Sequence, residues 1–228
     1  MRILITSGGT REYIDAVRFI TNMSTGGTGR VIAEHLSRAG HRVVCLCAEG
    51  AVRPADGRTE VIGFSGFGDL DAKMRALLKA GTFDAVIHLA AVSDYSPVSI
   101  KLGAKKLKPG RAAKLHSAAD TMAIVLKRNF KILDRIKGYA LENKKKSGPL
   151  VIGFKLTASA SKKEVLRRVT AMKTADYVVH NDLEKAGPGK KHLFHIYKAG
   201  VKLYRSSGAH ELAKRLDRIL TAGKTRSE

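Results

Sequence analysis

Small polar and glycine residues gather where the chain reads Asn-Met-Ser-Thr-Gly-Gly-Thr-Gly, directly ahead of an apolar helical pattern. Asn22, Ser24 and Thr25 supply side chains that can donate hydrogen bonds, and Gly26, Gly27 and Gly29 leave the backbone uncovered where the helix begins. Free N–H groups and the positive dipole end at the start of a helix attract anions. The stretch therefore predicts a phosphate site, and the structural alternative is a capped helix packed closely on a sheet.

Other ligand-type residues also follow apolar runs. They are Gly8, Gly9 and Thr10 after the first run, Ala90, Ala91 and Asp94 after a later one, Phe154 in a third, and Asn181 and Asp182 after a fourth. Two alanines make a flat wall for a base or ribose, and a carboxylate accepts from a sugar hydroxyl, a base amine or metal-bound water. A phenylalanine can stack on a base. Turns, a cap before Pro97 and a core phenylalanine are the structural alternatives.

Alternating strand and helix patterns bring these positions to one place. Apolar runs predict strands and a 3.6-residue period predicts helices, in the order strand 2–6, helix 24–39, strands 42–48 and 59–64, helix 69–80 and strand 84–91. Strand 150–154, helix 161–173 and strand 175–180 continue the alternation. Continuous apolar strands between helices indicate a parallel sheet covered on both faces. We expect one domain over residues 1–228 with a doubly wound, mostly parallel, Rossmann-like α/β fold, whose ligands bind beyond the carboxyl ends of strands.

The remaining segments are less regular. Residues 95–113 hold two prolines, two glycines and a run of lysines, which predicts a mobile basic flap. Residues 114–126 suggest a hairpin or strand, and 130–142 a helix. Strands at 193–198 and 201–205 around Ala199-Gly200 predict a late hairpin, and a last helix is expected over 209–221.

Charge is spread unevenly along the 228 residues, whose formal net charge is +22. Residues 1–100 hold 11 Lys and Arg against 10 Asp and Glu, whereas residues 101–228 hold 31 against 10. Polyanions such as nucleic acid, a nucleoside triphosphate or a phosphorylated metabolite are therefore favoured partners. No apolar run reaches the length of a membrane span, and the N-terminal run is too short for a signal peptide. Cys45 and Cys47 alternate on one strand and are expected to stay reduced, which predicts a cytoplasmic protein without a membrane partner.

Several stretches together resemble phosphopantothenoylcysteine synthetase. The chain from Thr6 through Gly29 is similar, without a gap, to that family's signature T-x-G-G-T-x-E-x-I-D-x-V-R-x-I-x-N-x-S-[ST]-G-x-x-G. Further matches follow in order: Ala90-Ala-Val-Ser-Asp-Tyr95, Lys114-Leu-His-Ser, Phe154-Lys-Leu and Asn181-Asp182. The resemblance covers about residues 1–185 and implies ATP- or CTP-dependent ligation of 4′-phosphopantothenate with cysteine through an acyl-nucleotide, in coenzyme A biosynthesis.

The resemblance also implies roles for individual residues. The implied catalytic residues are Asn22 and Lys114. Asn22 would hydrogen-bond the acyl-nucleotide, and Lys114, carried on a flap that closes over the phosphates, would neutralise their charge. Nucleotide and phosphate binding falls to Gly8, Gly9, Thr10, Ser24, Thr25, Gly26, Gly29, Ala90, Ala91, Asp94, Phe154, Asn181 and Asp182. Mg²⁺ is expected with the triphosphate, no protein ligand for a metal is assigned, and neither flavin nor NAD is expected.

Departures from the family pattern lie later in the chain. His116 and Ser117 stand where further lysines are usual, Thr157-Ala-Ser follows Phe154-Lys-Leu, and 184–195 lacks an asparagine common before the late hairpin. That hairpin, about residues 192–206, is the expected dimerisation element of a homodimer. CTP is favoured over ATP, and the motif begins at the N-terminus, which predicts a stand-alone synthetase.

Two other classes of function stay open at this point. An NAD(P)-dependent oxidoreductase on a similar fold calls for G-x-G-x-x-G after the first strand, but the spacing here differs and no Tyr-x-x-x-Lys pair occurs. A nucleic-acid-binding protein would suit the +22 charge, yet aromatic residues make up only 6% of the chain and no binding module is evident. Residues 101–114 and 144–146 are candidates for nonspecific contact with RNA or DNA, and the alternative is a solvated surface that steers anionic substrates.

Overall fold

The computed structural model describes residues 1–112, 114–116, 119–142, 148–185 and 192–224. Within these residues the main sheet has eight strands, in the spatial order β13-β12-β11-β10-β6-β1-β4-β5. Their bounds are β1 Arg2–Ser7, β4 Arg42–Ala48, β5 Glu60–Phe64, β6 Ala85–His88, β10 Leu150–Thr157, β11 Tyr177–Asp182, β12 Leu193–Lys198 and β13 Val201–Ser207. The strands from β11 to β5 run parallel, and β12 and β13 are antiparallel additions at one edge.

Helices cover both faces of this sheet because the apolar residues of its strands alternate between two cores. On one face, Ile3 and Ile5 of β1 pack in a cluster with residues of α1 (Gly27–Arg38) and α5 (Ala209–Lys224). On the other face, Leu4 packs with residues of α2 (Phe67–Ala80), the 3₁₀ helix η1 (Ile132–Arg135) and α3 (Ile136–Leu141). A smaller cluster seats α4 (Lys162–Thr170) on β11. The predicted doubly wound, mostly parallel fold is confirmed.

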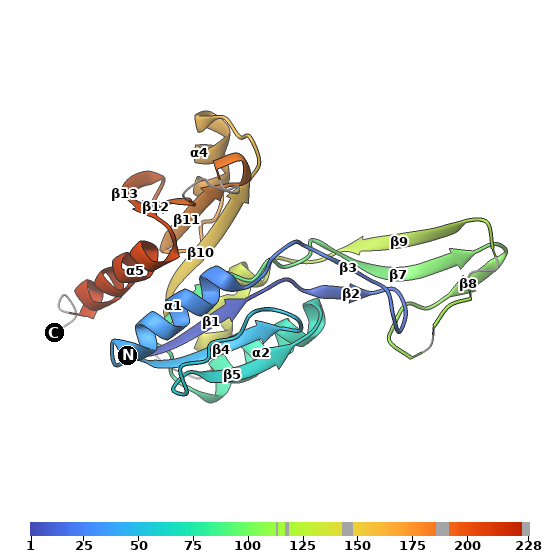
Figure 1. Cartoon of the computed structure of the whole chain (residues 1–228), viewed down its shortest axis with the longest axis horizontal. Helices are drawn as coiled ribbons and strands as arrows, with labels where there is room; N and C mark the ends of the chain where they lie inside the picture. Colours follow the sequence, from blue (N-terminus) through green and yellow to red (C-terminus); the bar gives the residue numbers. More distant parts are fainter. Residues whose placement is uncertain (113, 117–118, 143–147, 186–191, 225–228) are drawn as a thin grey trace.

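The segment predicted as a flap forms strands. β7 (Tyr95–Leu102) pairs with β8 (Lys105–Leu107) and β9 (Met122–Arg128) in an antiparallel three-stranded sheet. In Figure 1 this sheet projects from the end of the molecule opposite the chain termini, and we call it the arm. The strand expected within 114–126 begins only at Met122, and residues 113, 117 and 118 lie outside the described chain.

A second small sheet lies at the base of the arm. β2 (Arg11–Tyr13) and β3 (Phe19–Thr21) form an antiparallel hairpin between β1 and α1, which the sequence patterns did not predict. The buried Glu12 carboxylate accepts from the backbone N–H of Phe67 at 2.9 Å and from the Ser96 hydroxyl at 2.6 Å. One side chain thus fixes β2 to the start of α2 and to β7.

Element boundaries differ modestly from the sequence patterns. The helix expected over 24–39 begins at Gly27, and the one expected over 130–142 is divided into η1 and α3. β10 continues to Thr157, three residues beyond the predicted end. β12 and β13 join through Ala199 and Gly200, both with positive φ. Among the described helices, none is long and apolar enough to cross a membrane.

Candidate active site at the carboxyl edge of the sheet

The carboxyl ends of β1 and β6 lie side by side at the point where the chain reverses its direction of progress across the sheet. From β1 the chain builds outward through β4 to β5, and it then returns to β6 on the other side of β1. Open α/β sheets bind ligands in the crevice at such a point. The loops that follow the two strands meet there, because the Ala91 N–H donates to the Gly8 carbonyl at 2.8 Å and Gly9 bridges to Ala91.

Gly8 and Gly9 allow neighbouring chain segments to approach β1 closely. Gly8 has φ +89°, and a Cβ atom there would lie 2.6 Å from the Cβ atoms of both Ala48 and Ala51. A Cβ atom on Gly9 would lie 2.6 Å from the carbonyl oxygen of Asn22. Packing alone therefore requires glycine at both positions, and phosphate binding by this turn stays a prediction.

Thr10 is buried and holds two neighbouring segments. Its Oγ1 accepts from the Ser93 N–H at 3.0 Å, and its carbonyl accepts from the Thr21 hydroxyl at 2.8 Å. The structure therefore gives the Thr10 side chain a bracing role between the loop after β6 and strand β3. The predicted contact with nucleotide would require its hydroxyl to leave this position.

The start of α1 has the geometry of an anion site. Gly26, the N-cap residue, has φ +77°, and its carbonyl accepts from the Ser7 hydroxyl at 3.1 Å. The Gly27 N–H is directed to the Thr25 hydroxyl at 3.3 Å, while N–H groups in the first turn of a helix have no partner within the helix. The first turn holds no acidic residue, so its positive dipole end is unopposed by a side chain. Ser24 and Thr25 precede this turn, and their contact with phosphate stays a prediction.

Asn22 lies at the junction of these segments. It is exposed, and its Nδ2 donates to the carbonyl oxygens of Ala91 at 3.4 Å and Val92 at 3.3 Å. Both bonds are long, so the amide is available to a ligand that offers a better acceptor. The structure therefore places Asn22 beside the loop that carries the alanine pair, and its role toward a ligand stays a prediction.

The Thr6 hydroxyl, which is oriented by the buried His88, holds the loop that carries the two alanines. The Thr6 hydroxyl accepts from the N–H groups of Leu89 at 3.2 Å and Ala90 at 3.1 Å, so its own proton is directed to His88 Nδ1 at 2.9 Å. Burial lowers the pKa of His88 to about 4, so the ring is neutral at neutral pH and can accept this bond. Sequence patterns gave His88 no role, since a histidine inside an apolar strand carries no distinguishing signal.

Asp94 is exposed at the rim and forms an ion pair with Lys131. Its backbone is held by the Asn129 N–H, which donates to the Asp94 carbonyl at 2.8 Å. Lys155 of β10 is half-buried, and burial lowers the pKa of its ammonium group, with repulsion from Lys131 and Arg168 adding to the effect. Lys155 belongs to the Phe154-Lys-Leu match, which implies no role for it, and no sequence pattern pointed to Lys131.

Phe154 and Asn181 lie on the neighbouring strands of the same sheet. Phe154 lies within β10 and not at its end, and it is partly buried against the core that packs on α1 and α5. Asn181 lies on β11, and its side-chain amide is 3.1 Å from His192 Nε2. Stacking of Phe154 on a base, and a base contact from Asn181, stay predictions.

Asp182 is buried and organises the loop after β10. Its carboxylate accepts from the Thr157 hydroxyl and from the N–H groups of Ser159 at 3.3 Å, Ala160 at 3.4 Å and Glu184 at 3.1 Å. The Thr157 hydrogen bond, followed by the backbone donors, lowers the pKa of this carboxyl. Asp182 therefore supports the strand ends from within, and a direct contact with a base or ribose would have to replace one of these bonds.

Lys114 is exposed in the segment between β8 and β9, away from regular structure. The backbone of the next residue, Leu115, donates its N–H to the Asp15 carboxylate and accepts at its carbonyl from the Arg18 guanidinium, both in the β2–β3 turn. The structure thus attaches the lysine-bearing segment to the hairpin that leads to Asn22.

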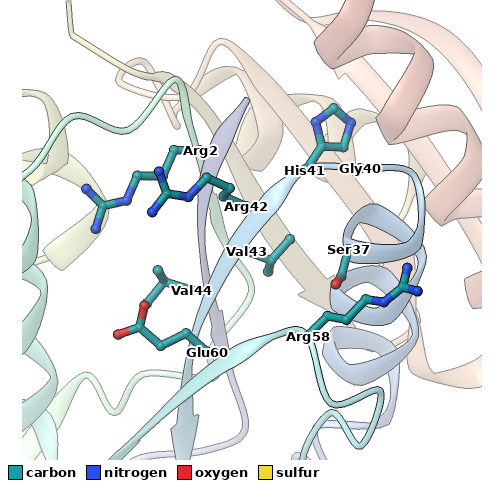
Figure 2. Close-up of a pocket in the computed structure, with 9 residues that line it drawn as sticks. All are labelled: Arg2, Ser37, Gly40, His41, Arg42, Val43, Val44, Arg58 and Glu60. Atoms are coloured by element: carbon teal, nitrogen blue, oxygen red, sulfur yellow. The ribbon is translucent and has the colours of Figure 1, made fainter.

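The opposite edge of the sheet also has a hollow, of about 410 Å³, at the amino ends of β1, β4 and β5. Figure 2 shows Arg2, Arg42 and Glu60 on one side of β4, and Ser37 and Arg58 on the other. None of the predicted site residues lines this hollow. Convergence of polar groups, and not hollow size, identifies the carboxyl edge as the candidate site.

Comparison with known proteins gives relatives along almost the whole chain. The model of the DNA/pantothenate metabolism flavoprotein C-terminal domain matches residues 1–224. The coenzyme A biosynthesis bifunctional protein CoaBC of Thermococcus kodakarensis is 28% identical over 219 residues, which are 94% of this chain and 49% of that protein. The chain thus spans about half the length of this curated relative.

Solved structures share the fold. A structure of the DNA/pantothenate metabolism flavoprotein from Streptococcus pneumoniae has a TM-score of 0.82 and 28% identity, covering 97% of this chain and 99% of that chain. The Cab2 mutant H337A, solved in complex with phosphopantothenate-cysteine, has a TM-score of 0.68 and covers 98% of this chain and 88% of that one. Its identity is 17%, so this second likeness shows the fold alone.

Proposed function

The chain belongs to the family of the DNA/pantothenate metabolism flavoprotein C-terminal domain, and we propose that it joins 4′-phosphopantothenate to cysteine using a nucleoside triphosphate. The resemblance stated from the sequence is thus confirmed at the level of the family. The relatives named as coenzyme A biosynthesis proteins support this reaction.

One structural observation carries the proposal most directly. Three features converge beside β1 and β6, where the chain reverses its direction of progress across the sheet. They are the Asn22 amide, the Ala91–Val92 backbone and the glycine-rich start of α1. This arrangement offers an amide donor next to an anion-binding helix start, with a smooth wall of small residues between them. An acyl-nucleotide needs these features, because it carries a phosphate, an acyl carbonyl and a flat base in one molecule.

The first half-reaction activates the carboxylate of 4′-phosphopantothenate. A carboxylate oxygen attacks the α-phosphorus of the triphosphate, and the bond from that phosphorus to the β-phosphate oxygen breaks, so pyrophosphate leaves. In this step the first turn of α1 would hold phosphate oxygens and Lys114 would neutralise their negative charge. Positioning and charge stabilisation supply the catalysis, without a covalent bond to the enzyme.

The second half-reaction forms the amide. The amine of cysteine attacks the acyl carbon, the bond from that carbon to the phosphate-bound oxygen breaks, and the nucleoside monophosphate leaves while the nitrogen gives up a proton. The Asn22 amide would hold the acyl-nucleotide in the interval. Its long bonds to Ala91 and Val92 would be exchanged for bonds to the intermediate.

Magnesium would arrive as part of the triphosphate co-substrate. Within the described residues, no group of three or more His, Cys, Asp or Glu side chains is placed to hold a metal ion. Mg²⁺ is commonly bound through substrate phosphates together with water and one or two carboxylates. Asp94 at the rim is the carboxylate that would serve, after release from Lys131.

An isotope experiment tests the chemistry. With ¹⁸O in the carboxylate of 4′-phosphopantothenate, the proposal predicts one ¹⁸O atom in the phosphate of the nucleoside monophosphate and none in pyrophosphate. Label that leaves the carboxylate in orthophosphate or water, with none in the nucleoside monophosphate, would rule out an acyl-nucleotide. Run with CTP and ATP in competition, the same reaction tests the proposed preference for CTP.

We also propose that the chain forms a homodimer through the late hairpin. The edge strand β13 exposes Val201, Leu203 and Tyr204, and an exposed apolar edge strand is prone to pair with another chain. Sedimentation should give twice the monomer mass for the native chain and the monomer mass for Leu203→Lys. A monomeric native chain at micromolar concentration would contradict the proposal.

A further inference from the structure

The turn between β2 and β3 is built around one buried carboxylate. Asp15 is 1% exposed, and its Oδ1 accepts from the N–H groups of Val17 at 3.0 Å and Arg18 at 2.8 Å. Its Oδ2 accepts from Arg18 Nε at 2.9 Å and Arg18 Nη2 at 2.6 Å. The Arg18 guanidinium, followed by backbone donors, holds the pKa of this carboxyl well below its usual range, so Asp15 is charged at every working pH.

The same carboxylate reaches a segment that is distant in sequence. Asp15 Oδ2 also accepts from the Leu115 N–H at 3.1 Å, and Arg18 Nη2 donates to the Leu115 carbonyl at 3.2 Å. The neighbouring carbonyl of Ile14 accepts from the Gly110 N–H at 3.3 Å. The turn therefore holds both ends of the stretch that carries Lys114.

The outgoing strand of the same hairpin ends next to Asn22. β3 pairs with β2 in the register Arg11↔Thr21, and the Thr21 hydroxyl bonds to the Thr10 carbonyl at 2.8 Å. A chain of contacts from Leu115 through Asp15 and the β2–β3 hairpin to Asn22 thus links Lys114 to Asn22, two residues that lie 92 positions apart in the sequence. Hydrogen bonds to a charged acceptor are shorter and stronger than neutral ones, which suits a brace of this kind.

We propose that Asp15 is a positioning residue that fixes the Lys114 segment relative to Asn22. The inference rests on the proposed function, since it assigns a purpose to the brace only if both residues act on one acyl-nucleotide. Asp15 is buried within the turn, so it acts through the Leu115 backbone and through the hairpin. Loss of its charge should release the lysine segment while the main sheet stays intact.

The test compares Asp15→Asn with a matched control, Asp56→Asn. Asp56 likewise accepts from two N–H groups of its own turn, Arg58 at 3.3 Å and Thr59 at 3.0 Å, and in the described chain its one side-chain link to another element is to Ser37 of α1, which lies outside the Lys114 segment. Amide exchange of Leu115, measured without substrate, should be at least tenfold faster in Asp15→Asn and unchanged in Asp56→Asn. Unchanged exchange in Asp15→Asn would overturn the brace.

Kinetics then test the purpose of the brace. Asp15→Asn should lower kcat for pyrophosphate release by tenfold or more with less than a threefold change in KM for the triphosphate. In a Lys114→Gln background the same change should cost less than twofold, because the lysine it positions is already absent. Equal losses in both backgrounds would show a merely structural role and overturn the proposal.

A second variant covers the case in which Asp15→Asn does not fold. Leu115→Pro removes the N–H that Asp15 accepts and leaves the turn itself unchanged, so it should reproduce the loss in kcat, and native kinetics would overturn the proposal. Failure of the two proposals is distinguishable. A native chain that releases no pyrophosphate overturns the proposed function and the positioning role with it, whereas an active native chain with an equally active Asp15→Asn overturns the positioning role alone.

Discussion

Gly29 of α1 lies so close to Ser7 of β1 that a Cβ atom on Gly29 would be 2.2 Å from the Ser7 hydroxyl oxygen and 2.6 Å from its Cβ atom. The same hydroxyl donates to the Gly26 carbonyl at 3.1 Å. The start of α1 is therefore set directly against the end of β1. This close approach brings the N–H groups of the first helical turn to the carboxyl edge of the sheet, where the proposed nucleotide site lies.

Substitution of Gly29 tests this packing. Gly29→Ala should lower the free energy of unfolding by about 1–3 kcal/mol, because α1 must move away from β1 to accept the methyl group. Triphosphate binding should weaken as the first turn shifts. The matched control is Gly68→Ala, also in the first turn of a helix but with nothing within 4 Å of the added Cβ, which should be neutral or slightly stabilising. Equal stabilities in urea for both variants would contradict the packing argument.

Asn22 is the residue on which amide formation should depend most. Asn22→Asp would retain the fold, because the side chain is exposed, but it would set a carboxylate against the carbonyls of Ala91 and Val92 and beside bound phosphates. We expect kcat for amide formation to fall by about 10²–10³, the usual cost of losing a preorganised donor. Met23→Ala, at a neighbouring and 96% exposed position, is the control and should retain activity. Native turnover by Asn22→Asp would remove Asn22 from the mechanism.

Lys114 should act on the first half-reaction. Lys114→Gln removes the charge that would neutralise the phosphates, and pyrophosphate release in a single turnover should slow by about 10²-fold or more. Lys106→Gln serves as control, since Lys106 is an exposed lysine of the same arm on β8. A uniform loss in both variants would point to general electrostatic attraction, and an unaltered rate in Lys114→Gln would refute its role.

Acid should destabilise the protein through His88. The pKa of His88 is about 4 in the folded protein against an ordinary 6.5, so the unfolded chain binds more protons between these values. The stabilisation is complete above pH 6.5 and is lost as the pH falls toward 4, to an extent of about 3 kcal/mol. Urea unfolding of the native chain and of His88→Asn at pH 4 to 7 measures this difference, with the exposed His210→Asn as control. Parallel pH curves for the native chain and His88→Asn would exclude His88 as the source.

The main sheet was predictable because its strands are buried on both faces. Runs such as 42–48 and 84–91 are apolar almost throughout, and their order along the chain admits few arrangements other than a parallel sheet. The arm was not predictable in the same way, because Ile100 is the one fully buried residue of β7 and the other positions alternate weakly. β2 and β3 have three residues each, too few for a periodic pattern to appear.

The site was predictable in its location and less so in its details. Glycines and small polar residues after strand ends indicated the carboxyl edge, and the structure places Asn22 against Ala91 there. Sequence patterns could not predict which side chains the carboxylates of the site contact. Asp94 pairs with Lys131, and Asp182 accepts a hydrogen bond from the buried Thr157. Asp15 was quoted within the family signature, but its bond to Leu115 depends on a contact across 100 positions of the chain.

The most direct test of the central claim is the reaction itself. The purified chain is incubated with 4′-phosphopantothenate, cysteine, Mg²⁺ and either CTP or ATP, and the products are quantified by mass spectrometry. The account predicts phosphopantothenoylcysteine, pyrophosphate and nucleoside monophosphate in equal amounts. In the steady state, Asn22→Asp should form all three products much more slowly than the native chain. Absence of the amide with both nucleotides, or its formation with release of orthophosphate and nucleoside diphosphate, would contradict it.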